Sequence, residues 1–156
     1  MISEASDADF AALLAKMGPQ GLKLPDGSFE DPAVLTMLRD LATSIRPTFA
    51  PASWLVVEQG EVVGLCSLVR APCDGGVDIG YGIMEARRAR GHATAAVEAV
   101  VKWARGDERV HLCRAETSVH NHPSQRVLEA NDFHRVGTRT DDEDGDLICW
   151  SLPVAE

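Results

Sequence analysis

The alternation of apolar and polar residues predicts a strand over residues 77–83, followed closely by an amphipathic helix. Small and apolar residues recur at helical spacing from residue 92 to residue 105. Gly106 then acts as a stop signal, and two basic residues, Lys102 and Arg105, suit the last turn of such a helix. The strand has one apolar face, formed by every second residue: Val77, Ile79, Tyr81 and Ile83.

The opposite face of the predicted strand carries little bulk, since Asp78, Gly80 and Gly82 belong to that side. Missing side chains leave room for a ligand to lie against the strand backbone. A second strand, over residues 110–117, and a short helix that ends near Phe133 follow along the chain. Strand, turn, helix and strand in this order predict a right-handed crossover, with the turn at the carboxyl ends of the strands.

The turn between the first strand and the helix reads Arg88-Ala89-Arg90-Gly91-His92-Ala93. The first N–H groups of a helix have no internal partners and carry a partial positive charge. Gly91 lets an anion approach these groups, and Arg88 and Arg90 add two full charges. Residues 88–94 therefore predict a cradle for a phosphate or pyrophosphate. The alternative is a solvated pair of arginines, because the string R-x-x-G-x-A is common by chance.

The rest of the chain predicts two more helices and two hairpins, without an internal repeat or an interdomain linker. With 156 residues, 45% of them hydrophobic, the chain is expected to form one domain with a sizeable core. The expected helices span residues 7–17 and 32–45, and the expected hairpins join 54–58 to 61–69 and 135–140 to 147–152.

The motifs occur in a characteristic order. R-x-x-G-x-A follows an I-G-Y-G-I strand and precedes N-x-x-S and then N-D-F. In this order and spacing, residues 54–152 resemble the GNAT acyltransferases, and most closely their ribosomal-protein N-terminal (Rim-type) branch. The resemblance implies an α/β (α+β) fold, a single GNAT-like domain over residues 1–156 whose mixed, mostly antiparallel sheet is splayed at its centre and flanked by about four helices. Residues 1–50 would then form a helical portion on the substrate side, and residues 54–152 the cofactor-binding core.

The same resemblance implies acetyl-CoA as the cofactor. Arg88, Gly91 and Ala93 match the family's pyrophosphate motif. The strand end, residues 83–85, matches the segment whose backbone pairs with pantetheine, and Asn121 and Ser124 match the positions beside the cofactor arm and the thiol. The expected cofactor-binding residues are Ile83, Met84, Glu85, Arg88, Ala89, Arg90, Gly91, His92, Ala93, Thr94, Asn121 and Ser124.

Two positions depart from the family's pattern. Many relatives carry a tyrosine four residues beyond the serine, as the proton donor to the thiolate, where this chain has Leu128. A glycine usually precedes the late phenylalanine, where this chain has Asp132, which implies a changed turn. The first departure leaves the identity of the acid open. The poor match of the amino-terminal portion leaves the acceptor open, because in this family that portion selects the substrate.

The expected chemistry is direct attack of an amine on a thioester. An amine with a pKa of about 10 is only about a thousandth deprotonated at neutral pH, so a general base assists the attack. Asp78 and, after it, Glu116 are the candidate bases, and Ser124 is the candidate group at the departing thiolate. For each carboxylate the alternative is a structural ion pair. An acylated-enzyme route is disfavoured, because no Cys or Ser has an identifiable His–acid pair.

Charge and composition narrow the partners. A net charge of −9 argues against a general nucleic-acid binder and mildly favours an amine-bearing acceptor, either a small molecule or a protein N-terminus. The chain has neither an apolar run that could span a bilayer nor a charged-then-apolar leader, which predicts a cytoplasmic protein without a membrane partner, monomer or homodimer. We expect no metal, because His120 and His122 have no convincing third ligand.

Two functions are compatible with these features. The first is an acetyl-CoA-dependent N-acetyltransferase that acts on a primary amine. The second is a catalytically weak acyl-CoA-binding or regulatory module on the same scaffold. The two carboxylates, Asp78 and Glu116, favour the enzyme.

Overall fold

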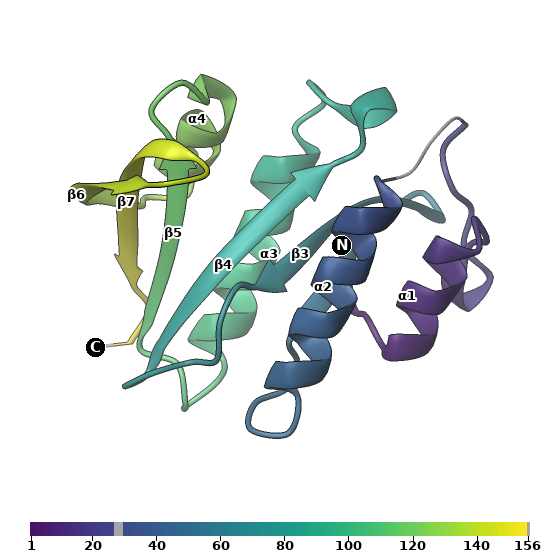
Figure 1. The fold of residues 1–156 in the computed structure, drawn as a ribbon. Helices are drawn as coiled ribbons and strands as arrows, with labels where there is room; N and C mark the ends of the chain where they lie inside the picture. The colour runs from purple at the N-terminus through teal and green to yellow at the C-terminus, as the bar shows by residue number, and fades with distance from the viewer. Residues whose placement is uncertain (27–29, 156) are drawn as a thin grey trace.

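The computed structural model describes residues 1–26 and 30–155 and shows a sheet flanked by helices (Figure 1). Among these residues, seven strands pair in the order β1-β2-β3-β4-β5-β7-β6, antiparallel except for β4 and β5. This architecture confirms the predicted α+β class and its mostly antiparallel sheet. The elements are β1 (Ile2–Glu4), α1 (Asp7–Leu14), the 3₁₀ helix η1 (Pro19–Gly21), α2 (Pro32–Ile45), β2 (Ser53–Glu58), β3 (Glu61–Leu68), β4 (Gly76–Ile83), the 3₁₀ helix η2 (Glu85–Arg87), α3 (His92–Arg105), β5 (Leu112–Ser118), α4 (His122–Ala130), β6 (His134–Asp141) and β7 (Gly145–Pro153).

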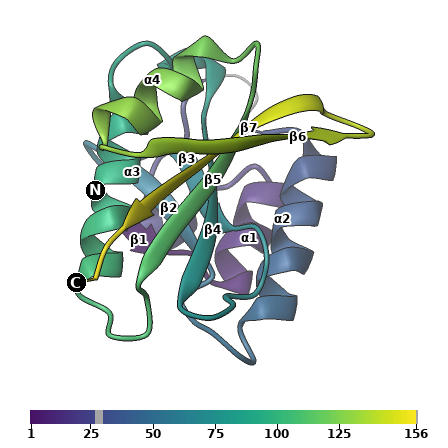
Figure 2. The same ribbon diagram turned by 90° about the vertical axis from the view of Figure 1, so that its left-hand side faces the viewer.

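The helices cover the two faces of the sheet unequally. α1 and α2 lie against one face and α3 against the other (Figures 1 and 2). α3 packs through the small and apolar stripe that its sequence predicts, and it ends at Gly106 as expected. Its buried residues, Ala96, Val97, Val100, Val101 and Ala104, join one hydrophobic core with the strands.

The sheet splays apart at its centre, between β4 and β5. The two strands pair only where Gly76–Asp78 face Leu112–Arg114. Beyond Asp78, β4 keeps β3 as its partner through Ile83, while β5 continues beside β7. Figure 1 shows the two strands diverging toward the carboxyl end of β4. Among residues 1–26 and 30–155, one edge of this half of β4 therefore has no paired strand, which leaves its backbone groups open to a ligand.

The first predicted helix is too long at its carboxyl end. It ends at Leu14 instead of residue 17, because Lys16 takes a positive φ of 59° and turns the chain out of the helix. Met17, the last residue of the predicted helix, is 64% exposed. The segment between the two predicted helices, residues 18–31, contains η1, and its residues 27–29 lie outside the described residues.

Two strand predictions also need correction. β5 begins at Leu112 instead of residue 110, because the N–H of Val110 donates to the carbonyl of Asp107 in a turn. The three-residue strand β1, which pairs with β2, was not predicted at all. So short a strand contains too little alternation to be recognised. None of the helices in the described ranges is both long and apolar enough to cross a membrane.

Candidate active site

The junction between β4 and α3 presents free backbone amides. After η2, Ala89 takes a φ of 63°, and Gly91 takes a φ of 80° as the residue that precedes the helix. Such left-handed conformations favour glycine, and they turn the chain sharply into α3. No side chain within the described part of the chain caps the first turn of α3. The amides of His92, Ala93 and Thr94 therefore remain available to an external acceptor at the positive end of the helix.

These amides border the larger cavity of the molecule, about 630 Å³, which lies between the end of β4, the β4–α3 junction and α4. Nine of the twelve expected cofactor-binding residues line it: Ile83, Arg88, Ala89, Gly91, His92, Ala93, Thr94, Asn121 and Ser124.

The other three expected residues lie elsewhere. Met84 lines the second cavity, and its N–H donates to the carbonyl of Val63 at 2.8 Å. Glu85 begins η2, and Arg90 is exposed. Neither of these two lines either cavity.

Arginines give the larger cavity its charge. The Nε of Arg88 donates to the carbonyl of Ile83 at 3.0 Å, which folds the side chain over the end of β4. Arg126, on α4, lines the cavity from the other side. Arg87 also lines it, but its guanidinium holds Glu61 through two hydrogen bonds, of 2.6 and 3.0 Å. That contact lowers the pKa of the Glu61 carboxyl. The charge that remains for an anion therefore comes from Arg88 and Arg126.

The start of α4 carries the serine singled out in the sequence. Asn121 precedes the helix, and its Oδ1 accepts the N–H of Ser124 at 3.2 Å. The Oγ of Ser124 lies 2.7 Å from the phenol oxygen of Tyr81, which reaches across from β4. Burial raises the pKa of Tyr81. Leu128, one turn further along α4, is fully buried in the core.

A second, smaller cavity of about 190 Å³ lies between α2 and strands β3 and β4. Tyr81 and Gly82 line both cavities, so the two spaces meet along β4, beyond its last pair with β5. The walls of the smaller cavity are mostly apolar, and among the described lining residues Glu30 has the one side chain that is charged at neutral pH. The full lining is Glu30, Val34, Leu38, Gly64, Leu65, Ser67, Val69, Gly80, Tyr81, Gly82 and Met84.

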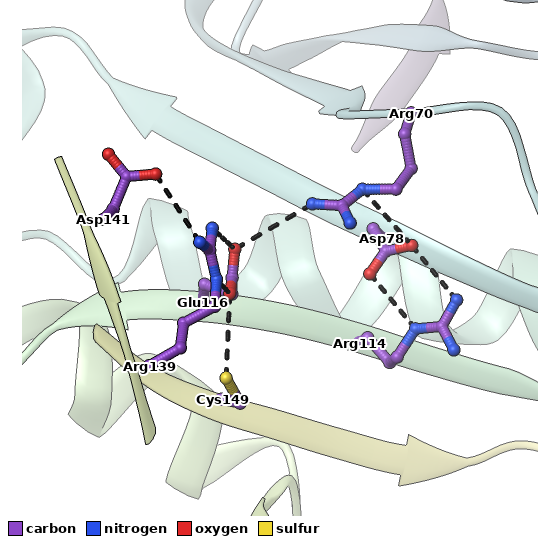
Figure 3. A network of polar contacts seen from close by, with 7 residues as sticks. All are labelled: Arg70, Asp78, Arg114, Glu116, Arg139, Asp141 and Cys149. Atoms are coloured by element: carbon purple, nitrogen blue, oxygen red, sulfur yellow. Dashed lines mark hydrogen bonds and ion pairs between the residues drawn. The ribbon is translucent and has the colours of Figure 1, made fainter. Parts of the chain in front are cut away.

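Asp78 lies on the same face of β4 as Gly80, which lines the smaller cavity. Its carboxylate accepts two hydrogen bonds from Arg114, of 3.1 and 3.2 Å, and lies 3.8 Å from Arg70 (Figure 3). Gly76 makes room for this arrangement, since a side chain there would meet the Arg114 guanidinium at 2.6 Å. Two guanidinium groups therefore surround the carboxylate.

Glu116 is also paired (Figure 3). Arg139 donates two hydrogen bonds to its carboxylate, and Arg70 lies 3.9 Å away. The contact with Arg139 lowers the pKa of Glu116. Arg70 thus lies between the two candidate bases and links them in one network on the sheet face that α3 does not cover.

Three of the four cysteines are poor nucleophiles in this structure. Burial raises the pKa of Cys66 to about 12 and that of Cys113 to about 11. The pKa of Cys149 is raised by burial and then by the neighbouring Glu116. A thiol reacts as its thiolate, so these three thiols are unsuited to carrying an acyl group at neutral pH.

Several residues of the two cavities were not identified from the sequence. Tyr81 was assigned to the apolar face of β4, although its hydroxyl lies at the cavity wall. Helical spacing offered a signal for two others, because Pro123 and Val127 are four residues apart and share a helix face beside Ser124. Arg87 and Arg126 carried no local signal that separated them from solvated arginines.

The fold is an α/β domain in which two cavities meet beside the N-terminus of a helix. The chain belongs to the acetyltransferase (GNAT) domain family, whose model matches residues 2–134, and it is an acetyltransferase. The family predicted from the motifs is thereby confirmed. A comparison with curated proteins gives no match.

Solved structures share the fold. An acetyl transferase of Salmonella typhimurium that modifies the N-terminal serine of a 50S ribosomal protein has a TM-score of 0.74 at 17% identity, covering 97% of this chain and 93% of its own. RimJ of Mycobacterium smegmatis, in complex with CoA-disulfide, has a TM-score of 0.71 at 19% identity, with coverages of 97% and 80%. A chimera of the Vibrio cholerae spermidine N-acetyltransferase SpeG and hSSAT has a TM-score of 0.73 at 13% identity, covering 99% of this chain and 95% of its own. At these identities the likeness concerns the fold.

Proposed function

We propose that this protein transfers the acetyl group of acetyl-CoA to a primary amine by direct attack of the amine on the thioester. The observation that carries the proposal is the meeting of two unlike cavities at Tyr81 and Gly82. A cavity with a free helix N-terminus and arginines in its wall suits the phosphates of the cofactor. An apolar cavity on the other side of the same strand suits an acceptor. The thioester carbonyl then lies where the two spaces meet.

The cofactor-binding role of residues 83–94 rests on backbone geometry. Pyrophosphate would accept hydrogen bonds from the amides that follow Gly91, with Arg88 and Arg126 supplying charge. The pantetheine arm would lie along the unpaired edge of β4, next to Ile83. Asn121 and Ser124 would border the arm from α4. Bound acetyl-CoA supplies the activated acyl group, and the protein orients it.

A carboxylate on the central strands would assist deprotonation of the acceptor amine, Asp78 before Glu116. Asp78 belongs to the strand face that lines the acceptor cavity, through Gly80. The lowered pKa of Glu116 makes that carboxylate a weaker base than an ordinary glutamate. The contact with Arg139 that lowers the pKa of Glu116 also keeps that carboxylate ionised at neutral pH, as a proton acceptor must be.

The lining of the smaller cavity favours a particular kind of amine. Val34, Leu38 and Met84 offer apolar contact but no charge. A polyamine or an aminoglycoside brings several cationic groups that need partners once they are desolvated, and the described lining offers one carboxylate, that of Glu30. An amine that carries a short apolar group next to its nitrogen fits these walls better, whether in a small molecule or at a protein N-terminus.

Four free cysteines agree with action in the reducing cytoplasm.

The deciding experiment measures CoA release from acetyl-CoA over a panel of amines. The panel pairs short apolar amines and peptides with apolar first residues against spermidine and an aminoglycoside. We expect turnover with the first set and little with the second. Tight acetyl-CoA binding in calorimetry without turnover on any amine would support the catalytically weak acyl-CoA-binding module instead. Absence of acetyl-CoA binding would exclude both functions.

A further inference from the structure

The contact between Tyr81 and Ser124 joins two elements at the place where the cavities meet. Tyr81 comes from β4 and Ser124 from the first turn of α4. Their oxygens are 2.7 Å apart, and the Tyr81 hydroxyl also lies 3.2 Å from the carbonyl oxygen of Ser124. Both residues line the larger cavity, and Tyr81 lines the smaller one too. The sequence pattern predicts that the Tyr81 side chain packs against the core. Its hydroxyl instead lies at the cavity wall.

We propose that Tyr81 is a positioning residue for the departing sulfur of CoA, which it serves by orienting the Ser124 hydroxyl. This inference rests on the proposed function. Either oxygen could donate in the shorter contact, and we assign the single phenol hydrogen of Tyr81 to the Ser124 Oγ instead of the more distant Ser124 carbonyl. Ser124 then keeps its own hydrogen, and the hydrogen bond that it accepts strengthens its donation to a third atom. The cavity side is the direction left for that hydrogen, and there the thioester sulfur would lie.

The step balances without a further reactant. The amine nitrogen bonds to the acetyl carbon, and the carbon–sulfur bond breaks with its electron pair left on sulfur. The Ser124 O–H stabilises the developing negative charge by a hydrogen bond to sulfur. A thiolate with a thiol pKa of about 8.5 is a fair leaving group, so a hydrogen bond suffices. The amine gives up one proton through the base to solvent, and solvent returns one proton to the free thiolate.

Burial explains why this pair acts on catalysis more than on stability. Tyr81 is only partly buried, and it packs against the core without belonging to its fully buried set. Cys66 faces it across the β3–β4 pair, and its thiol stays neutral, because burial raises its pKa to about 12. No charged side chain among the described residues hydrogen-bonds the phenol. Removal of the phenol oxygen therefore leaves no charge unpaired.

The first test is a double-mutant cycle on Tyr81→Phe and Ser124→Ala in the full chain. We expect each single variant to lower kcat about tenfold, while KM for acetyl-CoA stays unchanged, because only the charged transition state loses a donor. The double variant should be no slower than Ser124→Ala, since two residues that act as one unit lose the same contribution once. Thr140→Val is the matched control, because it deletes an exposed hydroxyl contact of 2.9 Å with Asp146 on the β6–β7 hairpin.

The second test uses the fact that the chain contains a single tyrosine. Protein labelled isotopically at the phenol carbon of tyrosine gives one NMR signal, whose position reports the hydrogen bonds of Tyr81. We expect CoA to shift this signal more than a CoA analogue that lacks the sulfur atom. In Ser124→Ala the two ligands should give the same signal. A tyrosine with a purely structural role would respond equally to both ligands in the unmodified protein.

Failure of this inference is distinct from failure of the proposed function. Full activity of Tyr81→Phe, or losses that multiply in the double variant, would overturn the positioning role while the acetyltransferase remains. Equal NMR shifts with CoA and its sulfur-free analogue would do the same. If neither ligand binds in calorimetry, the proposed function itself is wrong.

Discussion

The two cavities that meet at Tyr81 and Gly82 are built in opposite ways. The larger one takes most of its wall from one continuous segment, residues 81–94, and offers backbone amides and arginines. The smaller one takes its wall from side chains on α2, β3 and β4, which lie far apart in the sequence. With the proposed ligands, the larger cavity would recognise the cofactor mainly through backbone groups, and the smaller cavity would recognise the acceptor mainly through side chains.

Because of this difference, substitutions should affect the two cavities in different ways. A helix N-terminus binds phosphate with almost any side chains around it, provided that the backbone stays open. An apolar cavity changes its ligand as soon as one wall residue changes size or charge. Substitutions near Gly91 should therefore affect the cofactor, and substitutions near Gly80 and Gly82 should affect the acceptor.

The largest expected effect follows from Gly91→Glu. Among the described residues, no heavy atom lies within 4 Å of a Cβ added at Gly91, so a side chain there would point into open space instead of the core. Its carboxylate would repel the pyrophosphate and occupy the approach to the α3 amides. We expect acetyl-CoA affinity in calorimetry to fall about a hundredfold or more, of the order seen when like charges are forced together in a binding site.

The control for this variant is Gly145→Glu. Gly145 has a φ of 75°, close to the 80° of Gly91, and it too has open space around it. Both variants therefore carry the same backbone strain and the same added charge, but Gly145 lies at the turn between β6 and β7. Equal loss of affinity in the two would contradict a phosphate site at the β4–α3 junction.

The second effect concerns the carboxylates on the acceptor side. Asp78→Asn should lower kcat/KM about a hundredfold, the usual size for loss of a general base, with acetyl-CoA affinity nearly unchanged. The acidic limb of the pH–rate profile should also disappear. Steady-state kinetics over a range of pH provide the measurement, and thermal melting checks that Arg114, left without its carboxylate partner, has not disturbed the fold.

Glu116→Gln completes this test. If Asp78→Asn keeps full activity and Glu116→Gln is inactive, the base is Glu116. Full activity in both variants would mean that the enzyme uses the small fraction of amine already deprotonated in solution, and neither carboxylate would then be a base.

The third effect tests the apolar cavity. Among the described residues, no heavy atom lies within 4 Å of a Cβ added at Gly82. The backbone there is outside the left-handed region, so a side chain brings no backbone strain. Gly82→Leu should fill the space where the cavities meet and raise KM for the acceptor about tenfold, the lower end of the roughly 10–200-fold by which an apolar pocket discriminates a small change of size. Gly137→Leu is the matched control, because Gly137 on β6 has equally open surroundings. An equal rise of KM in both variants would show that the effect is not local to the cavity.

The local motifs explain how much of this site could be predicted. The junction from Arg88 to Thr94 lies within one turn of chain, so strand periodicity, Gly91 and the helix pattern identify it together. The helix α3 and its carboxyl end at Gly106 follow from the same pattern. Here the sequence neighbours are also the neighbours in space.

The contacts between distant segments could not be predicted in this way. The ion pairs of Asp78 with Arg114, and of Glu116 with Arg139, depend on strand register. Sequence alone offered an ion pair as one of two readings for these carboxylates, but it named neither partner. Tyr81 illustrates the same limit, because period-two alternation places its side chain on the apolar face and does not reveal what its hydroxyl meets on α4.

The smallest expected effect compares one ion pair from each side of the site. Arg87 lowers the pKa of Glu61 beside the cofactor cavity, and Arg139 lowers the pKa of Glu116 on the acceptor side. A carboxylate whose pKa is lower in the folded state stabilises the protein fully above its unfolded value, 4.5 for glutamate. This contribution is lost as the pH falls through the lower folded value. Both pairs are partly exposed, so each contributes at most about 1 kcal/mol.

Urea unfolding of Glu61→Gln and Glu116→Gln at neutral pH should therefore show a small loss of stability relative to the unmodified protein. The loss should vanish at a pH well below the folded values, where the native carboxylates are protonated too. It should be larger for Glu61, because its pair is the less exposed, with 21% and 26% of the side chains accessible against 29% and 45% for Glu116 and Arg139. A loss that persists unchanged in acid would mean that packing of the side chain, and not its charge, stabilises the fold.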